Sequence, residues 1–163
     1  MYVHIMFLHI FVTAMKIEEE IKQTKFKSEQ HKALINVIYT ANWIDSIHTR
    51  VLKQHSISPQ QFNLLRILRG QYPKPATVNL LIERMMDKMS NASRLVDKLI
   101  TKKLVERTQC ESDRRAVDVL ITKKGLNLLS VLDKEEKHMK EAYSELSETD
   151  AKALNRILDK MRG

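Results

Sequence analysis

The chain of 163 residues is poor in the residues that interrupt or cross-link a fold. It holds one cysteine, three glycines and three prolines. A single cysteine excludes an internal disulfide and a cysteine-based zinc site. So few glycines and prolines favour long helices and argue against a sandwich, a barrel or a collagen-like chain. Hydrophobic residues make up 43% of the sequence, which is enough to bury a core and argues against bulk disorder.

The sequence also lacks the standard signatures of enzymes. It contains no GxGxxG, P-loop, HExxH or GxSxG motif. No carboxylate pair and no combination of a nucleophile with a base stands out, and the histidines show no helical metal spacing. We therefore expect a protein that is not an enzyme and that needs no cofactor or metal.

Residues 1–14, MYVHIMFLHIFVTA, are almost wholly apolar. They are too few to cross a bilayer, which takes about 20 residues, and no Lys or Arg precedes them as in a signal peptide. We favour an upstream extension from a wrongly assigned start codon. A helix packed on a partner and a cleaved signal are the alternatives. With no membrane partner expected, the predicted location is the cytoplasm.

Basic residues are in excess, and the excess is local. The net charge is +8, and residues 59–124 hold 14 basic and 7 acidic residues, while the flanking segments are nearly balanced. A local basic excess suits a polyanionic partner such as nucleic acid. A solvated basic surface is the alternative that charge alone leaves open.

Apolar periodicity and capping residues predict a mainly helical chain. Residues 29–54 carry an apolar stripe at spacings of three and four. Ser58 and Gln61 form a capping box that begins the next helix, and Gly70 is expected to end it. The further predicted helices are 80–86 capped by Asn79, 88–102 capped by Asp87, 123–143 capped by Thr122, and a last one after Ser147.

The helices at 80–86 and 88–102 follow each other closely, which is the helix-turn-helix pattern. The second buries Ala92, Leu95, Val96, Leu99 and Ile100, and its opposite side is polar with few acids. Such a face fits a DNA major groove, although an ordinary solvent face would look alike. The predicted DNA-binding residues there are Lys88, Ser90, Asn91, Ser93, Arg94 and Lys98.

After this helix the apolar residues no longer recur at spacings of three and four, and the pattern becomes that of β-strands. Residues 104–108 and 117–121 read as two strands. Asp113, Arg114 and Arg115 lie near the tip between them. Arginines on a thin projection can enter a narrow minor groove, and a neighbouring carboxylate can orient a guanidinium. A hairpin directly after a helix-turn-helix predicts a winged helix, with these three residues on the wing.

Two segments, SNASRLVDKLITKKLVER and DRRAVDVLITKKG, resemble the recognition helix and the wing of the MarR family of bacterial multiple antibiotic resistance regulators. The resemblance extends over about residues 29–162. It implies a mainly α fold with a small β-hairpin, a winged helix-turn-helix with N- and C-terminal dimerisation helices. It also implies a homodimer on pseudo-palindromic promoter double-stranded DNA, commonly a repressor. Many members release DNA when a small phenolic or lipophilic effector, or an oxidant, reaches the region between the dimerisation and DNA-binding lobes.

By position, Ser90, Asn91, Ser93 and Arg94 match the family's exposed recognition-helix residues, and Asp113 and Arg115 match its acid–arginine pair on the wing. Two departures stand out. Lys103 replaces the glycine usual before the first wing strand, so it must adopt a left-handed conformation or the helix must end differently. Met86-Asp87-Lys88 replaces a frequent Gly-Leu-Ser. Cys110 lies on the predicted wing, away from the N-terminal helix where oxidant-sensing members carry their cysteine, so we expect a surface thiol.

These interpretations divide the chain into an apolar extension at 1–14, a dimerisation region at 15–57, the winged helix-turn-helix at 58–124, and a long helix plus dimerisation helix at 125–163. A regulator of transcription is the favoured function. A non-sequence-specific architectural DNA-binding protein and a helical protein-interaction module are the alternatives. A regulator should prefer one DNA site over random DNA, which an architectural protein would not do. Its DNA affinity should also fall steeply with salt, which is not expected for a module that binds only protein.

Overall fold

The structure is a computed structural model that describes residues 15–109, 117–135 and 144–163. It divides into two compact units, one ending at Trp43 and one beginning at Ile44. The predictions for residues 1–14, for the hairpin tip and for 136–143 lie outside the described residues. Within the described ranges no helix is long and apolar enough to cross a membrane.

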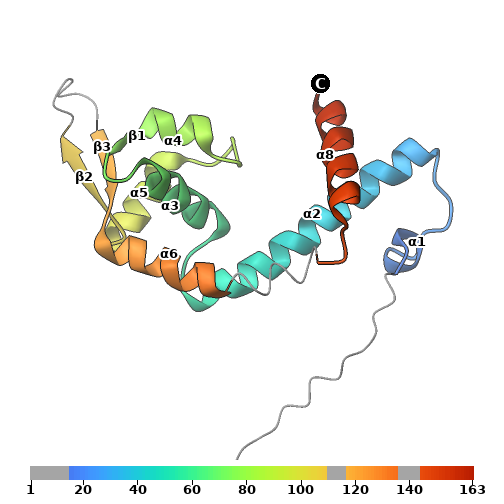
Figure 1. Ribbon diagram of the computed structural model, residues 1–163, viewed down its shortest axis with the longest axis horizontal. Coiled ribbons are helices and arrows are strands. Elements are labelled where there is room, and N and C mark those ends of the chain that lie inside the picture. The colour runs from blue at the N-terminus through green and yellow to red at the C-terminus, as the bar shows by residue number, and fades with distance from the viewer. Residues whose placement is uncertain (1–14, 110–116, 136–143) are drawn as a thin grey trace, which may run out of the picture. The chain divides into compact units, whose positions relative to one another are not determined.

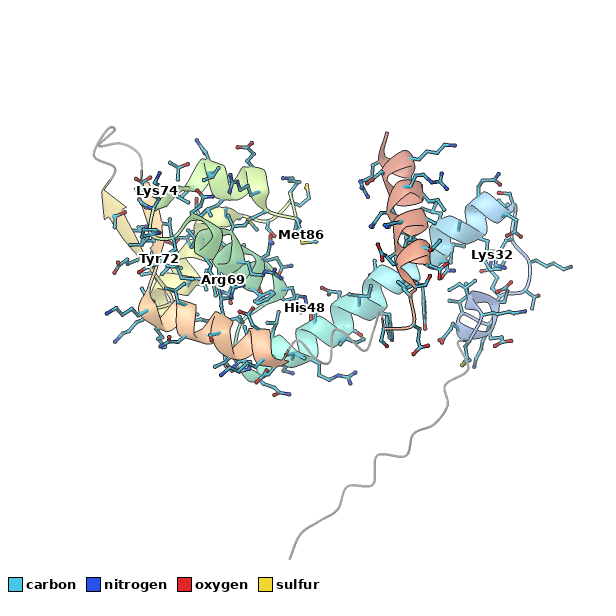
Figure 2. All side chains as sticks on the ribbon, viewed as in Figure 1. Lys32, His48, Arg69, Tyr72, Lys74 and Met86 are labelled. Atoms are coloured by element: carbon cyan, nitrogen blue, oxygen red, sulfur yellow. The ribbon has the colours of Figure 1, made fainter. Side chains whose placement is uncertain are left out.

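The first unit contains α1 (Ile17–Glu20) and the N-terminal part of α2 (Glu29–Gln54). The predicted helix at 29–54 is confirmed with the same bounds. Ile17 is buried, and an ion pair between Lys32 and Glu18 joins α2 to α1. Figure 2 labels Lys32 on this helix.

The second unit holds the hydrophobic core. After α2 come α3 (Pro59–Gln71), β1 (Ala76–Thr77), α4 (Val78–Arg84), α5 (Ala92–Thr101), β2 (Val105–Gln109), β3 (Val117–Ile121), α6 (Lys123–Glu135) and α8 (Glu148–Arg162). Figure 1 shows the short strands beside α3, α4 and α5. The largest fully buried side chains are Leu52, Leu64, Leu65, Leu68, Leu81, Met85, Val96, Leu99, Val119, Ile121 and Leu129. The core therefore packs α3, α4, α5 and α6 against one sheet.

The sheet has three antiparallel strands in the order β1-β3-β2. Both strands of the predicted hairpin are present, and β3 is central because Val119 pairs with Arg107 of β2 and with Ala76 of β1. The strand β1 was not predicted. Its two residues are too few to show a period, and they form a strand only through their pairing with β3.

The caps of α3 and α6 are confirmed. Ser58 and Gln61 make the reciprocal capping-box hydrogen bonds at the start of α3, and the Thr122 hydroxyl accepts the Gly125 N–H at 3.1 Å at the start of α6. Gly70 does not end α3, because the helix continues to Gln71. The cap of α4 is Thr77 and not Asn79, because the Thr77 hydroxyl accepts the Leu80 N–H at 3.1 Å.

The helix α5 begins at Ala92, so the predicted start at Lys88 is wrong. The Asp87 carboxylate caps no helix: it accepts the Met89 N–H at 3.0 Å and the Ser90 hydroxyl at 2.6 Å within a turn. Asn91 caps α5 by accepting the Arg94 N–H at 3.0 Å. Residues 88–91 therefore lead into the helix and are not part of it.

Lys103 adopts the left-handed conformation, the first of the two alternatives that the sequence left open, with φ of 60°. Its N–H bonds the carbonyl of Ile100 at 2.8 Å, and the Leu104 N–H bonds the carbonyl of Leu99 at 3.0 Å. These two bonds form the glycine-type helix ending known as the Schellman motif. A lysine thus occupies a position that glycine takes without strain.

Candidate nucleic-acid interface

The helix α5 is held by one face and presents the other to solvent. Ala92, Val96 and Leu99 are buried in the core. Ser93, Arg94, Asp97, Lys98 and Thr101 are exposed. The predicted amphipathic pattern of this helix is confirmed, because the spacing of three and four places the apolar and polar residues on opposite sides.

Arg94 and Lys98 are the two cations on the exposed face of α5. Neither has a carboxylate partner among the ion pairs of the described residues. Asp97, the acid between them, pairs instead with Arg107 on β2. The only carboxylate on α5 is therefore engaged by the hairpin, and the two cations keep their charge available for an outside partner.

Three predicted residues precede the helix. Lys88 donates a hydrogen bond to the Glu83 carbonyl at the end of α4. Ser90 is half-buried, and its hydroxyl donates to Asp87. Hydrogen bonds from the Ser90 hydroxyl and the Met89 backbone lower the pKa of Asp87, so this turn keeps its charged acceptor. The structure therefore groups Ser93, Arg94 and Lys98 on the helix, and places Lys88, Ser90 and Asn91 in the segment before it.

The wing residues Asp113, Arg114 and Arg115, and also Cys110, lie outside the described residues. The strands that carry this tip are described, and the register of β2 with β3 runs from Val105 opposite Ile121 to Gln109 opposite Val117. The hairpin is therefore paired along both strands up to the point where the tip begins.

A cavity of about 550 Å³ lies beside the segment that leads into α5. Its wall includes Asp45 and His48 of α2, Phe62 and Arg66 of α3, and Asp87. The His48 ring meets the Phe62 ring edge-on with 5.1 Å between centroids, and the Arg66 guanidinium lies 5.7 Å from the Phe62 centroid. We call this space the Phe62 cavity. Sequence reasoning missed it, because its wall comes from three separate segments.

The segment between α4 and α5 is anchored to α3. The Asn63 side chain accepts the Met86 N–H at 3.1 Å, and both residues border the Phe62 cavity. Met85 is buried, whereas Met86 and Met89 are 86% and 94% exposed. Of these three side chains, only that of Met85 packs in the core. Figure 2 labels Met86 and His48, which both contribute to the cavity wall.

No group of three or more His, Cys, Asp or Glu side chains in the described ranges could hold a metal ion. The candidate interface consists of exposed cations and hydroxyls on α5. Such an arrangement can bind and orient a polyanion by hydrogen bonds and charge.

Comparisons with known proteins agree with this description. Residues 57–117 match the model of the MarR family. A comparison with curated proteins gives no significant match. Among solved structures, a MarR transcription factor from Planctomyces limnophilus is 27% identical with a TM-score of 0.63, over 83% of this chain and 98% of that chain.

Two further structures share the fold at lower identity. A mutant MarR from E. coli complexed with operator DNA is 20% identical with a TM-score of 0.71, over 85% of this chain and 99% of that one. BpsR from Bordetella bronchiseptica, whose DNA binding is regulated by 6-hydroxynicotinic acid, is 18% identical with a TM-score of 0.66, over 81% and 99%. The match at 57–117 spans α3, α4, α5 and β2 and reaches the first residue of β3. Residues 57–117 are thus similar to the MarR family, and the chain shares the winged-helix fold of the solved MarR transcriptional regulators.

Proposed function

We propose that the chain is a DNA-binding transcriptional regulator that acts as a homodimer, represses from a pseudo-palindromic operator, and is released by a small effector. One observation carries the DNA-binding part: the exposed face of α5 presents Ser93, Arg94 and Lys98, while Asp97 is engaged by Arg107. A groove-facing helix needs cations and hydroxyls that are free of internal partners. The DNA-bound MarR from E. coli shares the fold.

Exposed apolar residues on α2 and α8 support the homodimer, because a second copy of the chain would cover them. Leu34 and Ile38, one turn apart on α2, are 47% and 52% exposed. On α8, Leu154, Ile157 and Met161 are also exposed and recur at spacings of three and four. Stripes of this kind on helices are covered by partner helices in dimers. Sedimentation at low micromolar concentration should give about twice the mass of one chain, and a folded monomer there would contradict the proposed assembly.

The wing supplies the second DNA contact in this proposal. Arg115 would reach the minor groove and the backbone, and Asp113 would orient it, with Arg114 beside them. Lys88, Ser90 and Asn91 would lie near phosphates at the start of α5, because they precede the helix and do not share its face. The basic members of this set belong to the local basic excess of residues 59–124.

The Phe62 cavity is the proposed effector site. Its volume of about 550 Å³ lies within the range for small-molecule pockets, roughly 300–1,000 Å³. An aromatic ring can stack beside Phe62, and Arg66 and His48 can meet a phenolate or a carboxylate. Since Met86 and Asp87 border the cavity, a ligand there touches the segment that leads into the recognition helix.

The decisive experiment compares binding to the chain's own upstream DNA with binding to random DNA, with and without 6-hydroxynicotinic acid and simple phenols. A sequence-specific regulator should prefer its own site by about 10³ or more. Arg94→Ala should cost roughly 1–3 kcal/mol on that site and less on random DNA. Arg156→Ala, which removes the same charge from an exposed position on α8, should change neither affinity.

The wing variants separate two kinds of contact. Arg115→Ala and Asp113→Ala should weaken binding to both DNAs by similar factors, and Arg115→Ala should flatten the salt dependence by about one phosphate contact. Equal affinity of the unmodified protein for its own site and for random DNA would instead support an architectural DNA-binding protein. Wild-type binding by both wing variants would exclude the wing from the interface.

A further inference from the structure

A second cavity lies at the start of α3, and residues from the C-terminal part of α2 and from α5 also line it. It has a volume of about 390 Å³ and is lined by three lysines, Lys53, Lys98 and Lys102, together with hydroxyl-bearing residues that include Thr49 and Ser58. We call it the lysine cavity. No Asp or Glu belongs to its lining.

Lys102 is the innermost of the three lysines and is half-buried. Its ammonium donates one hydrogen bond to the Ser56 carbonyl and one to the Gln61 side-chain oxygen, the latter at 2.9 Å. Both acceptors are neutral, and an ammonium group has three N–H donors. The positive charge of Lys102 is thus hydrogen-bonded but not neutralised, and one donor remains for a ligand.

The acceptors that hold Lys102 are themselves fixed. Gln61 is buried, and its side-chain oxygen also accepts the Ser58 N–H at 3.2 Å as part of the capping box. Ser56 lies two residues after the end of α2, has a φ of 57°, and accepts the hydrogen bond of the lysine at its carbonyl. The ammonium therefore has a defined position in the cavity and does not sweep through solvent as most surface lysines do.

The positive charges in the cavity repel one another. Burial and the positive charge of Lys98 lower the pKa of Lys102. None of the three lysines has a carboxylate partner in the part of the chain that the structure describes. An anion in the cavity would relieve this repulsion and accept the remaining donors.

We propose that the lysine cavity is a binding site for a phosphate group. Three point-charge donors and nearby hydroxyls suit a tetrahedral dianion, whereas a planar carboxylate is better matched by the arginine fork. Ile57 and Leu95 supply apolar wall for the group attached to the phosphate. The phosphate can belong to a free phosphorylated small molecule or to a nucleic-acid backbone. The binding chemistry does not depend on the proposed regulatory function.

The test titrates the full-length protein with inorganic phosphate at constant ionic strength and follows backbone amide shifts by NMR. Saturable shifts should concentrate at Ser58 and Lys102. Lys53 and Lys98 are exposed and make no ion pair with the residues that the structure describes, so Lys53→Gln and Lys98→Gln should both fold. Each should weaken phosphate binding by about fivefold or more, the loss expected for one charge-assisted hydrogen bond.

Lys134→Gln is the matched control, because Lys134 is an exposed lysine of α6 outside the cavity. It should change phosphate affinity by less than about twofold, as expected for general charge alone. Shifts that do not saturate, or an equal loss in the control, would overturn the proposal. Lys102→Met adds a direct test of the innermost group, provided that its amide spectrum shows a folded protein.

Duplex DNA distinguishes the two sources of the phosphate. If DNA supplies it, Lys53→Gln should weaken DNA binding and inorganic phosphate should compete with the duplex. If a free ligand supplies it, Lys53→Gln should lose phosphate binding while DNA affinity stays unchanged. Loss of DNA binding by Arg94→Ala with phosphate binding intact would show that the lysine cavity works independently of the recognition face.

Discussion

Gly125 and Gly70 both lie in helices, and substituting alanine should have opposite effects at the two positions. A Cβ at Gly125 would lie 2.3 Å from the backbone oxygen of Leu104 and 2.7 Å from Cγ1 of Ile121. A Cβ at Gly70 would meet nothing within 4 Å. The two substitutions add the same methyl group, so the difference between them measures the close approach at Gly125.

The oxygen that Gly125→Ala would strike cannot move freely. The Leu104 carbonyl accepts the Thr122 N–H and the Thr122 hydroxyl, each at 3.1 Å, and these bonds join the start of β2 to the start of α6. Overpacking costs about 1–3 kcal/mol, and each weakened hydrogen bond adds about 1 kcal/mol. Replacing a glycine within a helix by alanine stabilises the fold by about 1 kcal/mol, which offsets part of this cost. The net expectation is a loss of about 2–4 kcal/mol.

Thermal and urea unfolding followed by circular dichroism would measure the effect, at one protein concentration because a dimer's stability depends on it. Gly125→Ala should lower Tm by roughly 4–16 °C, since a loss of 1 kcal/mol lowers Tm by about 2–4 °C in a chain of this length. Gly70→Ala should leave Tm unchanged or raise it by about 1–3 °C. A Gly125→Ala protein as stable as the wild type would refute the close approach between α6 and the residue before β2.

Three further predictions follow from local structure. Lys103→Gly should stabilise the protein by about 0.5–1 kcal/mol in urea unfolding, because a left-handed lysine is strained and glycine is not; a destabilised variant would contradict this ending of α5. Asn91→Ala should cost about 1 kcal/mol by removing the cap of α5, whereas Asn91→Ser should restore most of it. A chain that starts at Met15 should fold, dimerise and bind DNA as the full chain does, and loss of dimerisation would show that residues 1–14 are a structural element.

Local signals predicted most of the fold because they act within a few residues. The capping box at Ser58 and the stripe of α5 depend only on neighbours in the sequence, and both are present. The start of α5 was predicted wrongly because Asp87 and Asn91 are equally good caps by residue type. The choice between them is made by the turn at Asp87, whose carboxylate is already occupied by Ser90.

The cavities could not be predicted, because their walls combine distant segments. Lys102 shows the limit: in sequence it is one of several lysines near the end of a helix. Its special position depends on Ser56 and Gln61, which lie 46 and 41 residues away. The ion pair of Asp97 with Arg107 is likewise a tertiary contact, and it decides which charges on α5 remain available.

Thr77 takes part both in the sheet and in the start of α4. It pairs with Asp118 in the sheet, while its hydroxyl caps α4. Thr77 therefore links the hairpin directly to α4, the first helix of the predicted helix-turn-helix. They should exchange amide hydrogens as one cooperative block, not as separate parts. On DNA, a displacement of α4 would therefore carry the hairpin with it. In a dimer, the distance between the DNA-binding parts of the two subunits would then change as a whole.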